Sequence, residues 1–281
     1  MLPPAVEEAV AAVASDRESG ATRLAERTLR AFDLLASSGR ADPAVVRELA
    51  HRLQEAQPAM ASVRNVARLG AKVLVEAPRD WPAFRESMGR QLEEGRRLAA
   101  RNFVNLLEGP ATILTLSRSA NVFECLALAH GKGLIQEVFV LESRPLREGA
   151  EFAKDLRAAG VRASAIAYES AVACVGGATL GLAGADTVLA DGSIVNRAGT
   201  HALAALCRAA GKPFYVVCET FKIGTNPPAP SPLFDLTPAV LVTGIVTERG
   251  VLLPQQVRST AMDWGRESGS RDSTSDDSPE G

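Results

Sequence analysis

The 281-residue sequence predicts an α/β fold in which an N-terminal helical domain precedes a doubly wound parallel-sheet domain. Residues 1–107 carry apolar residues at helical spacing and contain no convincing strand. From residue 108 onward, short apolar runs bounded by turn residues alternate with helical stretches, which is typical of strands buried on both faces of a parallel sheet. The periodic pattern ends after residue 256. We therefore divide the chain into 1–107, 108–258 and a Ser/Asp/Gly-rich tail, 259–281, that we expect to be disordered.

The helices of residues 1–107 have recognisable start signals. Asp42 precedes Pro43, and Asp80 precedes Trp81 and Pro82, so each aspartate is placed to cap a helix that has proline in its first turn. The segment that starts at Trp81 is expected to run long and to join the two domains. The expected helices are Val6–Val13, Ala21–Ala36, Pro43–Glu55, Ala59–Val75 and Trp81–Leu106.

The apolar runs after residue 108 are expected to form the strands, with right-handed crossovers through the helices between them. The expected strands are Ala111–Leu116, Glu137–Leu141, Arg162–Ile166, Thr187–Leu189, Phe214–Cys218 and Val242–Val246. The expected helices are Ala120–Gly131, Leu146–Ala159, Glu169–Ala173 and Asn196–Ala210. The glycine-rich stretch Gly176–Gly181 does not open a helix, so we interpret it as a helix end and a turn.

Composition excludes several classes of protein. A net charge of −2 and an aromatic content of 5% favour neither a nucleic-acid nor a membrane partner. The four cysteines are dispersed in apolar segments without a CxxC pair, which indicates buried, reduced thiols and no metal site. No GxGxxG follows the first strand and no GxxxxGK[ST], HExxH or GxSxG occurs, so no cofactor is expected. We find no signal peptide and no membrane-spanning run, and we expect a cytoplasmic protein.

Polar groups follow several of the predicted strands at the point where each strand ends. Carboxyl ends of parallel strands meet at one edge of a sheet, where ligands bind. A helix that begins directly after the first strand would offer free N–H groups to a phosphate. An acid, an amide and cations at this edge would suit a phosphorylated polyol. The residues concerned are Ser117, Arg118, Ser119, Glu142, Ser143, Arg144, Asp186, Asn196, Arg197 and Lys222.

Several of these segments resemble one known family. The matching pieces are ILTLSRS (113–119), ESRP (142–145), GAD (184–186), DGSIVNRAGT (191–200), KPFYVVCETFK (212–222) and FDLTPAVLVTGIVTERGVLLP (234–254). On these pieces, residues 111–257 resemble the family that unites the regulatory alpha subunit of translation initiation factor 2B, methylthioribose-1-phosphate isomerase and archaeal ribose-1,5-bisphosphate isomerase. Residues 16–32 and 57–63 are also similar to it.

The resemblance implies a Rossmann-like second domain, a sugar phosphate bound between the domains, and a homodimer or a higher assembly of dimers. In the isomerases, a cysteine after the first strand and the aspartate of the GAD turn convert an aldose to a ketose. The aspartate falls on Asp186 and the cysteine falls on Ser117. The resemblance implies that the substrate is positioned by Arg17, Gly20, Ala21, Arg118, Ser119, Arg144, Asn196, Arg197 and Lys222.

Three positions depart from the isomerase pattern. Ser117 carries a hydroxyl, which does not ionise without an adjacent base, and its sequence neighbours supply none; only His201 could approach in principle. Gln57 stands where the isomerases tend to have an arginine that contacts phosphate. Arg197 replaces the usual lysine, which keeps the charge but changes its geometry.

Three functions therefore stay open. The first is an aldose–ketose isomerase that acts on a ribose 1-phosphate derivative such as ribose 1,5-bisphosphate. Asp186 favours it, because the regulatory alpha subunits tend to have glutamate in that turn. The second is a non-catalytic regulatory subunit of the initiation factor 2B type, which Ser117 favours. The third is a degenerate family member with another role.

Overall fold

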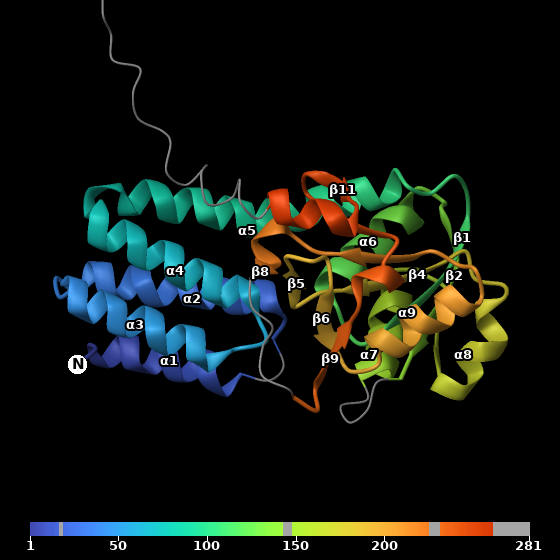
Figure 1. Cartoon of the computed structure of the whole chain (residues 1–281), viewed down its shortest axis with the longest axis horizontal. Helices are drawn as coiled ribbons and strands as arrows, with labels where there is room; N and C mark the ends of the chain where they lie inside the picture. Colours follow the sequence, from blue (N-terminus) through green and yellow to red (C-terminus); the bar gives the residue numbers. More distant parts are fainter. Residues whose placement is uncertain (17–18, 143–147, 225–230, 261–281) are drawn as a thin grey trace, which may run out of the picture.

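The computed structural model describes residues 1–16, 19–142, 148–224 and 231–260. Helices α1–α5 form one end of the molecule, and the sheets with helices α6–α9 form the other (Figure 1). Helix α5, Trp81–Val104, runs along the molecule and reaches the larger sheet. The predicted fold class, a helical N-terminal part followed by an α/β part, is confirmed.

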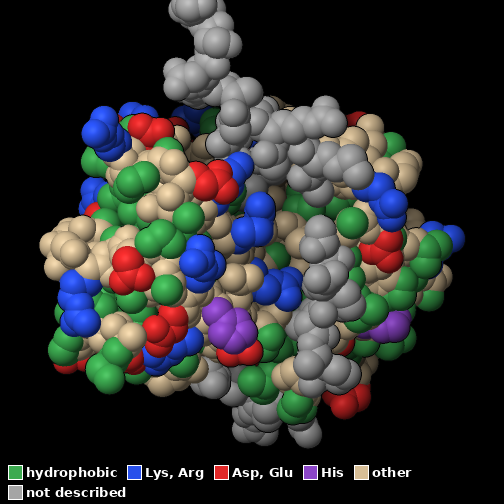
Figure 2. Space-filling model, turned by 60° about the vertical axis from the view of Figure 1, so that its left-hand side comes forward, with side chains coloured by type: hydrophobic (Ala, Val, Ile, Leu, Met, Phe, Trp, Pro, Cys, Tyr) green, Lys and Arg blue, Asp and Glu red, His purple; other side chains and the backbone are tan. Residues whose placement is uncertain are grey.

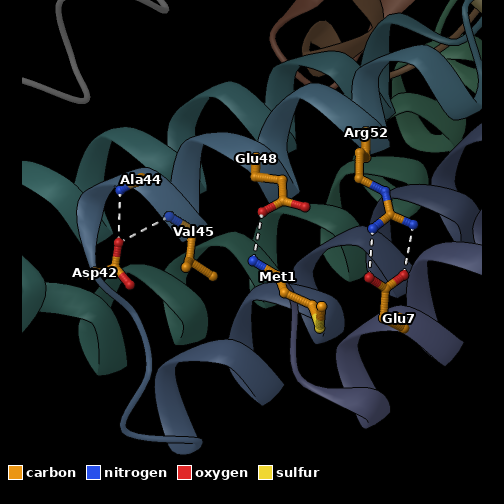
Figure 3. A network of polar contacts seen from close by, with 7 residues as sticks. All are labelled: Met1, Glu7, Asp42, Ala44, Val45, Glu48 and Arg52. Atoms are coloured by element: carbon orange, nitrogen blue, oxygen red, sulfur yellow. Dashed lines mark hydrogen bonds and ion pairs between the residues drawn. The ribbon is translucent and has the colours of Figure 1, made fainter.

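The N-terminal helices pack around one apolar core, in which α2 lies against α1, α4 and α5. Asp42 caps α3, because its carboxylate accepts hydrogen bonds from the backbone N–H groups of Ala44 and Val45 at 3.0 and 3.2 Å (Figure 3). Glu7 and Arg52 join α1 to α3 through two parallel hydrogen bonds of 2.7 Å. The remaining helix bounds are α1 Pro4–Ser15, α2 Ala21–Ser37, α3 Pro43–Ala56 and α4 Ala61–Glu76.

The larger sheet has seven strands in the order β11-β10-β7-β4-β1-β2-β3. All neighbouring strands are parallel except β10 and β11, which form an antiparallel hairpin. The bounds are β1 Ala111–Leu116, β2 Ile135–Leu141, β3 Ala163–Ile166, β4 Leu180–Gly184, β7 Phe214–Val217, β10 Gly244–Thr247 and β11 Gly250–Leu252.

Helices cover both faces of this sheet, as the doubly wound prediction requires. One face packs against the end of α5, α6 and α7, and the opposite face packs against α8 and α9. Each face has its own apolar core cluster. The helix bounds are α6 Ala120–Gly131, α7 Glu148–Ala158, α8 Tyr168–Val175 and α9 Thr200–Ala209.

The sequence prediction was wrong about one central strand. It placed Thr187–Leu189 in the parallel sheet, whereas β4 occupies that place with the small-residue run Leu180–Gly184. The small residues are needed, because a Cβ on Gly181 would lie 2.6 Å from the Cys207 sulfur and 2.9 Å from the Phe214 ring. A glycine-rich strand in a crowded layer carries no β-propensity signal.

Residues 187–189 instead form β5 in a second, four-stranded sheet with the order β8-β5-β6-β9. This sheet was not predicted. Because its strand β6, Ile194–Arg197, precedes α9, the predicted helix 196–210 begins only at Thr200. Its other strands are β8 Ile223–Gly224 and β9 Phe234–Thr237.

The strand order changes direction between β1 and β4. From β1 the chain proceeds to β2 and β3 on one side, and it then builds β4, β7 and β10 on the other. Ligands of such sheets bind beyond the carboxyl ends of the strands at this switch point. The two strand ends are close together: a Cβ on Gly184, the last residue of β4, would lie 2.5 Å from the Ser119 hydroxyl.

The helical part docks against this same edge. The Ala61 N–H, at the start of α4, lies 3.3 Å from the Asp186 carbonyl and 2.8 Å from the Thr187 hydroxyl, and it donates to both. The Asn65 amide donates to the carbonyls of Phe221 and Ile223 at 2.8 Å each. Residues at the switch point are therefore covered by the N-terminal helices.

The described residues bear on the expectations for membrane spans, surface charge and cysteines. None of the helices there is both long and apolar enough to pass through a bilayer. Basic, acidic and apolar side chains are interspersed over the face in Figure 2, where several Lys and Arg side chains lie near the middle. All four cysteines are free; Cys125, Cys207 and Cys218 are buried as expected, whereas Cys174 is partly exposed.

Candidate functional site

Asp186 lies two residues beyond the end of β4, at the switch point. Burial is the main cause that raises the pKa of its carboxyl above the ordinary value. Lys222 and Arg197 oppose this shift by their positive charges, and Glu148 adds to it by its negative charge. A carboxyl group whose pKa is raised holds its proton to higher pH than an ordinary carboxyl does, which favours a role in donating that proton. Asp186 is therefore suited to the role of general acid.

Ser117 follows β1 directly and is 3% exposed. Its φ of 57° is the only positive value at a non-glycine residue among the described positions. This left-handed conformation costs an L-residue about 1–2 kcal/mol. Strain of this kind persists where the surrounding structure requires a particular side-chain position, as in binding and catalytic sites.

A carboxylate from another element faces Ser117. Its hydroxyl donates a 2.5 Å hydrogen bond to Glu148 Oε2, at the start of α7. The other oxygen, Glu148 Oε1, lies 3.6 Å from Arg197 Nη2 on β6. The Arg197 guanidinium also lies over the Phe234 ring, 5.2 Å from its centroid. Groups from β1, α7 and β6 thus meet in one chain of contacts.

This arrangement corrects one expectation from the sequence. Ser117 was expected to lack a base, with His201 as the only candidate. The structure supplies Glu148, 31 residues further along the chain, while His201 is exposed on α9 and its backbone N–H donates to Asp235. The sequence places Glu148 shortly after the strand β2, but that β2 lies beside β1 is known only from the fold.

A second buried ion pair lies beside Asp186. Lys222 Nζ is 3.0 Å from Glu219 Oε2, and both side chains are almost completely buried. Glu219 also accepts hydrogen bonds from Thr22 Oγ1 at 3.0 Å and Asn121 Nδ2 at 2.8 Å. Burial alone would raise the pKa of Glu219, but Lys222 and the hydrogen bonds outweigh burial and lower it.

The same balance applies to the lysine. Burial alone would lower the pKa of Lys222, but the negative charge of Glu219 outweighs burial and raises it. Both partners are therefore charged at neutral pH. Because Thr22 belongs to α2 and Asn121 to α6, the pair joins the helical part to the sheet at the site. The sequence places Glu219 at the end of the strand that precedes Lys222, but only the structure shows that it pairs with Lys222.

The structure places the other predicted residues as follows. Asn196, on β6, donates to the Thr200 hydroxyl at 3.0 Å. Ser119 caps α6 by accepting from the Val122 N–H at 3.3 Å. Gly20 and Ala21 form the start of α2. They directly precede Thr22, whose hydroxyl contacts Glu219.

Arg118 points elsewhere, because its Nε donates to Asp155 at 2.7 Å and its side chain is 63% exposed. Arg17 and the predicted segment Ser143–Pro145, with Arg144, lie outside the described residues. Most of the predicted tail, from residue 261 onward, lies outside them as well.

Gln57 makes hydrogen bonds that hold the N-terminal helices together. Its amide donates to the carbonyls of Val13 and Asp16, at 2.8 and 2.9 Å, and it is buried. An amide here joins the end of α3 to the end of α1. The departure from arginine at this position therefore has a physical account in the packing of the N-terminal helices.

The described residues contain no group of three or more His, Cys, Asp or Glu side chains placed to hold a metal ion. A groove of about 740 Å³ lies between α2 and α5, away from the predicted site residues. It is lined by Asp33, Ala36, Ser37, Trp81, Pro82, Arg85 and Glu86.

Taken together, the fold and site define a class: an α/β protein with an acid, a hydroxyl, a second carboxylate and two cations at the switch point of its sheet. The sequence profile of the initiation factor 2 subunit family matches residues 17–231. The chain belongs to this family.

Individual relatives carry two kinds of name. A translation initiation factor eIF-2B subunit 2-like protein of Pyrococcus abyssi is 32% identical over 278 residues, which cover 90% of this chain and 98% of the relative. A ribose 1,5-bisphosphate isomerase of Haloferax volcanii is 30% identical, with 85% of each chain covered. The crystal structure of the Pyrococcus horikoshii OT3 translation initiation factor eIF-2B matches with a TM-score of 0.83 at 28% identity, covering 91% of this chain and 99% of that one.

Proposed function

We propose that this chain is an aldose–ketose isomerase that acts on a ribose 1-phosphate derivative such as ribose 1,5-bisphosphate. The observation that carries the proposal is the placement of Asp186, with its raised pKa, beside Lys222 and Arg197 at the carboxyl edge of the sheet. A phosphate on C1 prevents the sugar ring from opening as an ordinary hemiacetal does. The ring opens only when an acid protonates the ring oxygen, and Asp186 supplies that acid. The name of the Haloferax volcanii relative motivates the choice of sugar.

The cations have a separate role in this proposal. Arg197 and Lys222 bind the phosphate groups, together with Arg17 and Arg144, which lie outside the described residues. Charge-assisted hydrogen bonds of this kind are about twice as strong as neutral ones, so they hold the sugar with its ring oxygen near the acid. Asn196 is proposed to bind a sugar hydroxyl.

The test is turnover. Purified protein is incubated with ribose 1,5-bisphosphate and with methylthioribose 1-phosphate, and ketose formation is followed by ³¹P NMR. Asp186→Asn, which removes the acid, is expected to lower the rate about 10²–10⁴-fold. The matched control is Asp191→Asn, at an exposed aspartate in the turn that precedes β6, which should stay within twofold. Equal rates for the two variants would refute the role of Asp186.

A second candidate is a non-catalytic subunit of the initiation factor 2B type. The serine at position 117 and the similarity to the Pyrococcus abyssi protein over 98% of its length favour it. Micromolar binding of both sugar phosphates without turnover would decide for this candidate and against the isomerase.

We also propose that the chain assembles as a homodimer or as a higher assembly of dimers. Large exposed apolar side chains support this, because four of them, Leu236, Val240, Val251 and Leu253, fall within residues 236–253. Strands β9 and β11 lie at the edges of their sheets, where unpaired backbone groups invite association. Light scattering on the purified protein should give at least twice the mass of one chain, 29.6 kDa.

A further inference from the structure

Ser117 is held in a geometry that serves proton transfer. It is buried, its backbone is left-handed, and its hydroxyl proton points at Glu148 Oε2 over 2.5 Å. A serine that only lined a ligand site would not need a carboxylate to accept its proton. The hydrogen bond leaves the hydroxyl oxygen free to accept a proton from another group.

Glu148 is in turn held in place. Its second oxygen lies 3.6 Å from Arg197 Nη2, and the two side chains are 20% and 15% exposed. Arg197 thus places a positive charge beside this carboxylate. Asp186 lies within electrostatic range of both groups. Asp186 is thus suited to donate a proton and Glu148 to accept one, which are the roles of a general acid and a general base.

From this geometry we infer that Glu148 is the proton acceptor of the site and acts through the Ser117 hydroxyl. The inference deepens the proposed isomerase function and rests on it for the chemical step. A hydroxyl does not ionise by itself at neutral pH, but it can pass a proton to a hydrogen-bonded carboxylate. The pair Ser117–Glu148 would therefore accept the proton in place of the cysteine thiol that the isomerases have at position 117.

The proposed step balances as follows. Asp186 gives its proton to the ring oxygen, and the electron pair of the bond between that oxygen and C1 moves to the oxygen. The proton on C2 moves to Ser117 Oγ while the hydroxyl proton moves to Glu148, and the C2–H electrons form a C1–C2 double bond. The C2 hydroxyl then returns a proton to Asp186 as C2 becomes a ketone. Glu148, again through Ser117, returns a proton to C1.

The first test does not depend on activity. In a Ser117→Cys variant, the negative charge of Glu148 beside the thiol should raise the thiol pKa. In the double variant Ser117→Cys/Glu148→Gln, the neutral glutamine should remove that effect. The apparent pKa from alkylation rates, resolved by peptide mass spectrometry, should be about one unit lower in the double variant, which is about a tenfold faster alkylation below the pKa. The partly exposed Cys174 provides the internal reference. An unchanged pKa would overturn the inference.

The second test uses turnover. Glu148→Gln should lower kcat about 10²–10⁴-fold and leave KM within a few-fold, and Glu148→Asp should recover part of the loss. The matched control is Glu151→Gln on the same helix, an exposed residue 3.8 Å from Lys154, which should change neither constant. In D₂O, the wild-type product should carry deuterium at C1, because the transferred proton exchanges through the hydroxyl.

The outcomes separate the two proposals. Wild-type turnover with no effect of Glu148→Gln, or without deuterium at C1, overturns the proton acceptor while the isomerase function stands. Absence of turnover with every sugar phosphate tested, combined with the thiol shift, overturns the isomerase function while the assignment of Glu148 as the acceptor facing position 117 stands.

Discussion

The buried pair Glu219–Lys222 allows a sharp prediction about stability. Replacing Lys222 with methionine removes the cation and leaves Glu219 fully buried with its charge uncompensated. At the separation of 3.0 Å, the attraction between unit charges is about 5.5 kcal/mol at an effective dielectric constant of about 20. Breaking a buried pair typically costs about 3–5 kcal/mol, slightly less than the full attraction. We expect Lys222→Met to lower the unfolding free energy by about 3–5 kcal/mol.

Because Glu219 is the origin of the cost, removing its charge as well should restore stability. The double variant Glu219→Gln/Lys222→Met keeps the acceptor oxygen that Thr22 uses and leaves no charge behind. We expect it to recover more than half of the loss. The control is Lys132→Met, an exposed position at the end of α6, which should stay within about 0.5 kcal/mol of wild type.

The assay is urea unfolding followed by circular dichroism, with acid unfolding as a second measurement. The folded-state pKa of Glu219 is lowered, so its contribution to stability is present above its unfolded pKa and is lost as pH falls through the folded value. Without Lys222 that folded pKa rises, so acid unfolding should move to higher pH. A cost below 1 kcal/mol, or a double variant no more stable than Lys222→Met, would refute the reasoning.

Two further predictions concern Asp186 and Asp42. The folded-state pKa of Asp186 is raised, mainly by burial, so the stability that its protonated form contributes is complete below the unfolded pKa and is lost as pH rises through the folded value. Asp186→Asn should therefore raise Tm more at pH 8 than at pH 5; an equal or negative change at both would contradict this. Asp42→Ala removes the cap of α3 and should cost about 1 kcal/mol, or about 2 °C in Tm, whereas Asp42→Asn should cost less. Differential scanning calorimetry measures both, and identical Tm values for Asp42→Ala and wild type would refute the capping argument.

Local signals predicted most of the elements correctly. The helices from Pro43 and Trp81 begin where the sequence predicts, and β1 has the predicted bounds Ala111–Leu116. Asp42 caps its helix as expected, whereas the expectation for Asp80 was wrong, because its side chain makes no capping hydrogen bond. These features depend on neighbouring residues or on period, which a sequence displays directly. Strand β4 was missed, because glycine at 181 and 184 is selected by contacts with Cys207, Phe214 and Ser119, and these contacts come from distant segments.

The site was predicted only in part, because some of its residues follow predicted strands and others come from distant segments. Ser117, Asp186 and Lys222 come after β1, β4 and β7, and the rule for parallel sheets brings such residues to one edge. Arg197 instead reaches the site from β6 of the second sheet, which was not predicted. The acceptor of the Ser117 proton was not found, because Glu148 lies 31 residues away at the start of α7. A pairing at that separation leaves no local pattern.

The sequence alone determined most of the helices and the strands with a clear apolar pattern, because capping and hydrophobic period act over short distances. It also determined the family, through motifs at fixed positions. It did not determine β4 or the second sheet. Only the tertiary structure decided that Glu148 faces Ser117, that Glu219 neutralises Lys222, and that burial raises the pKa of Asp186. Proton affinities depend on which charges and apolar groups surround a side chain in space, and these neighbours come from α2, α6, α7 and β6 together.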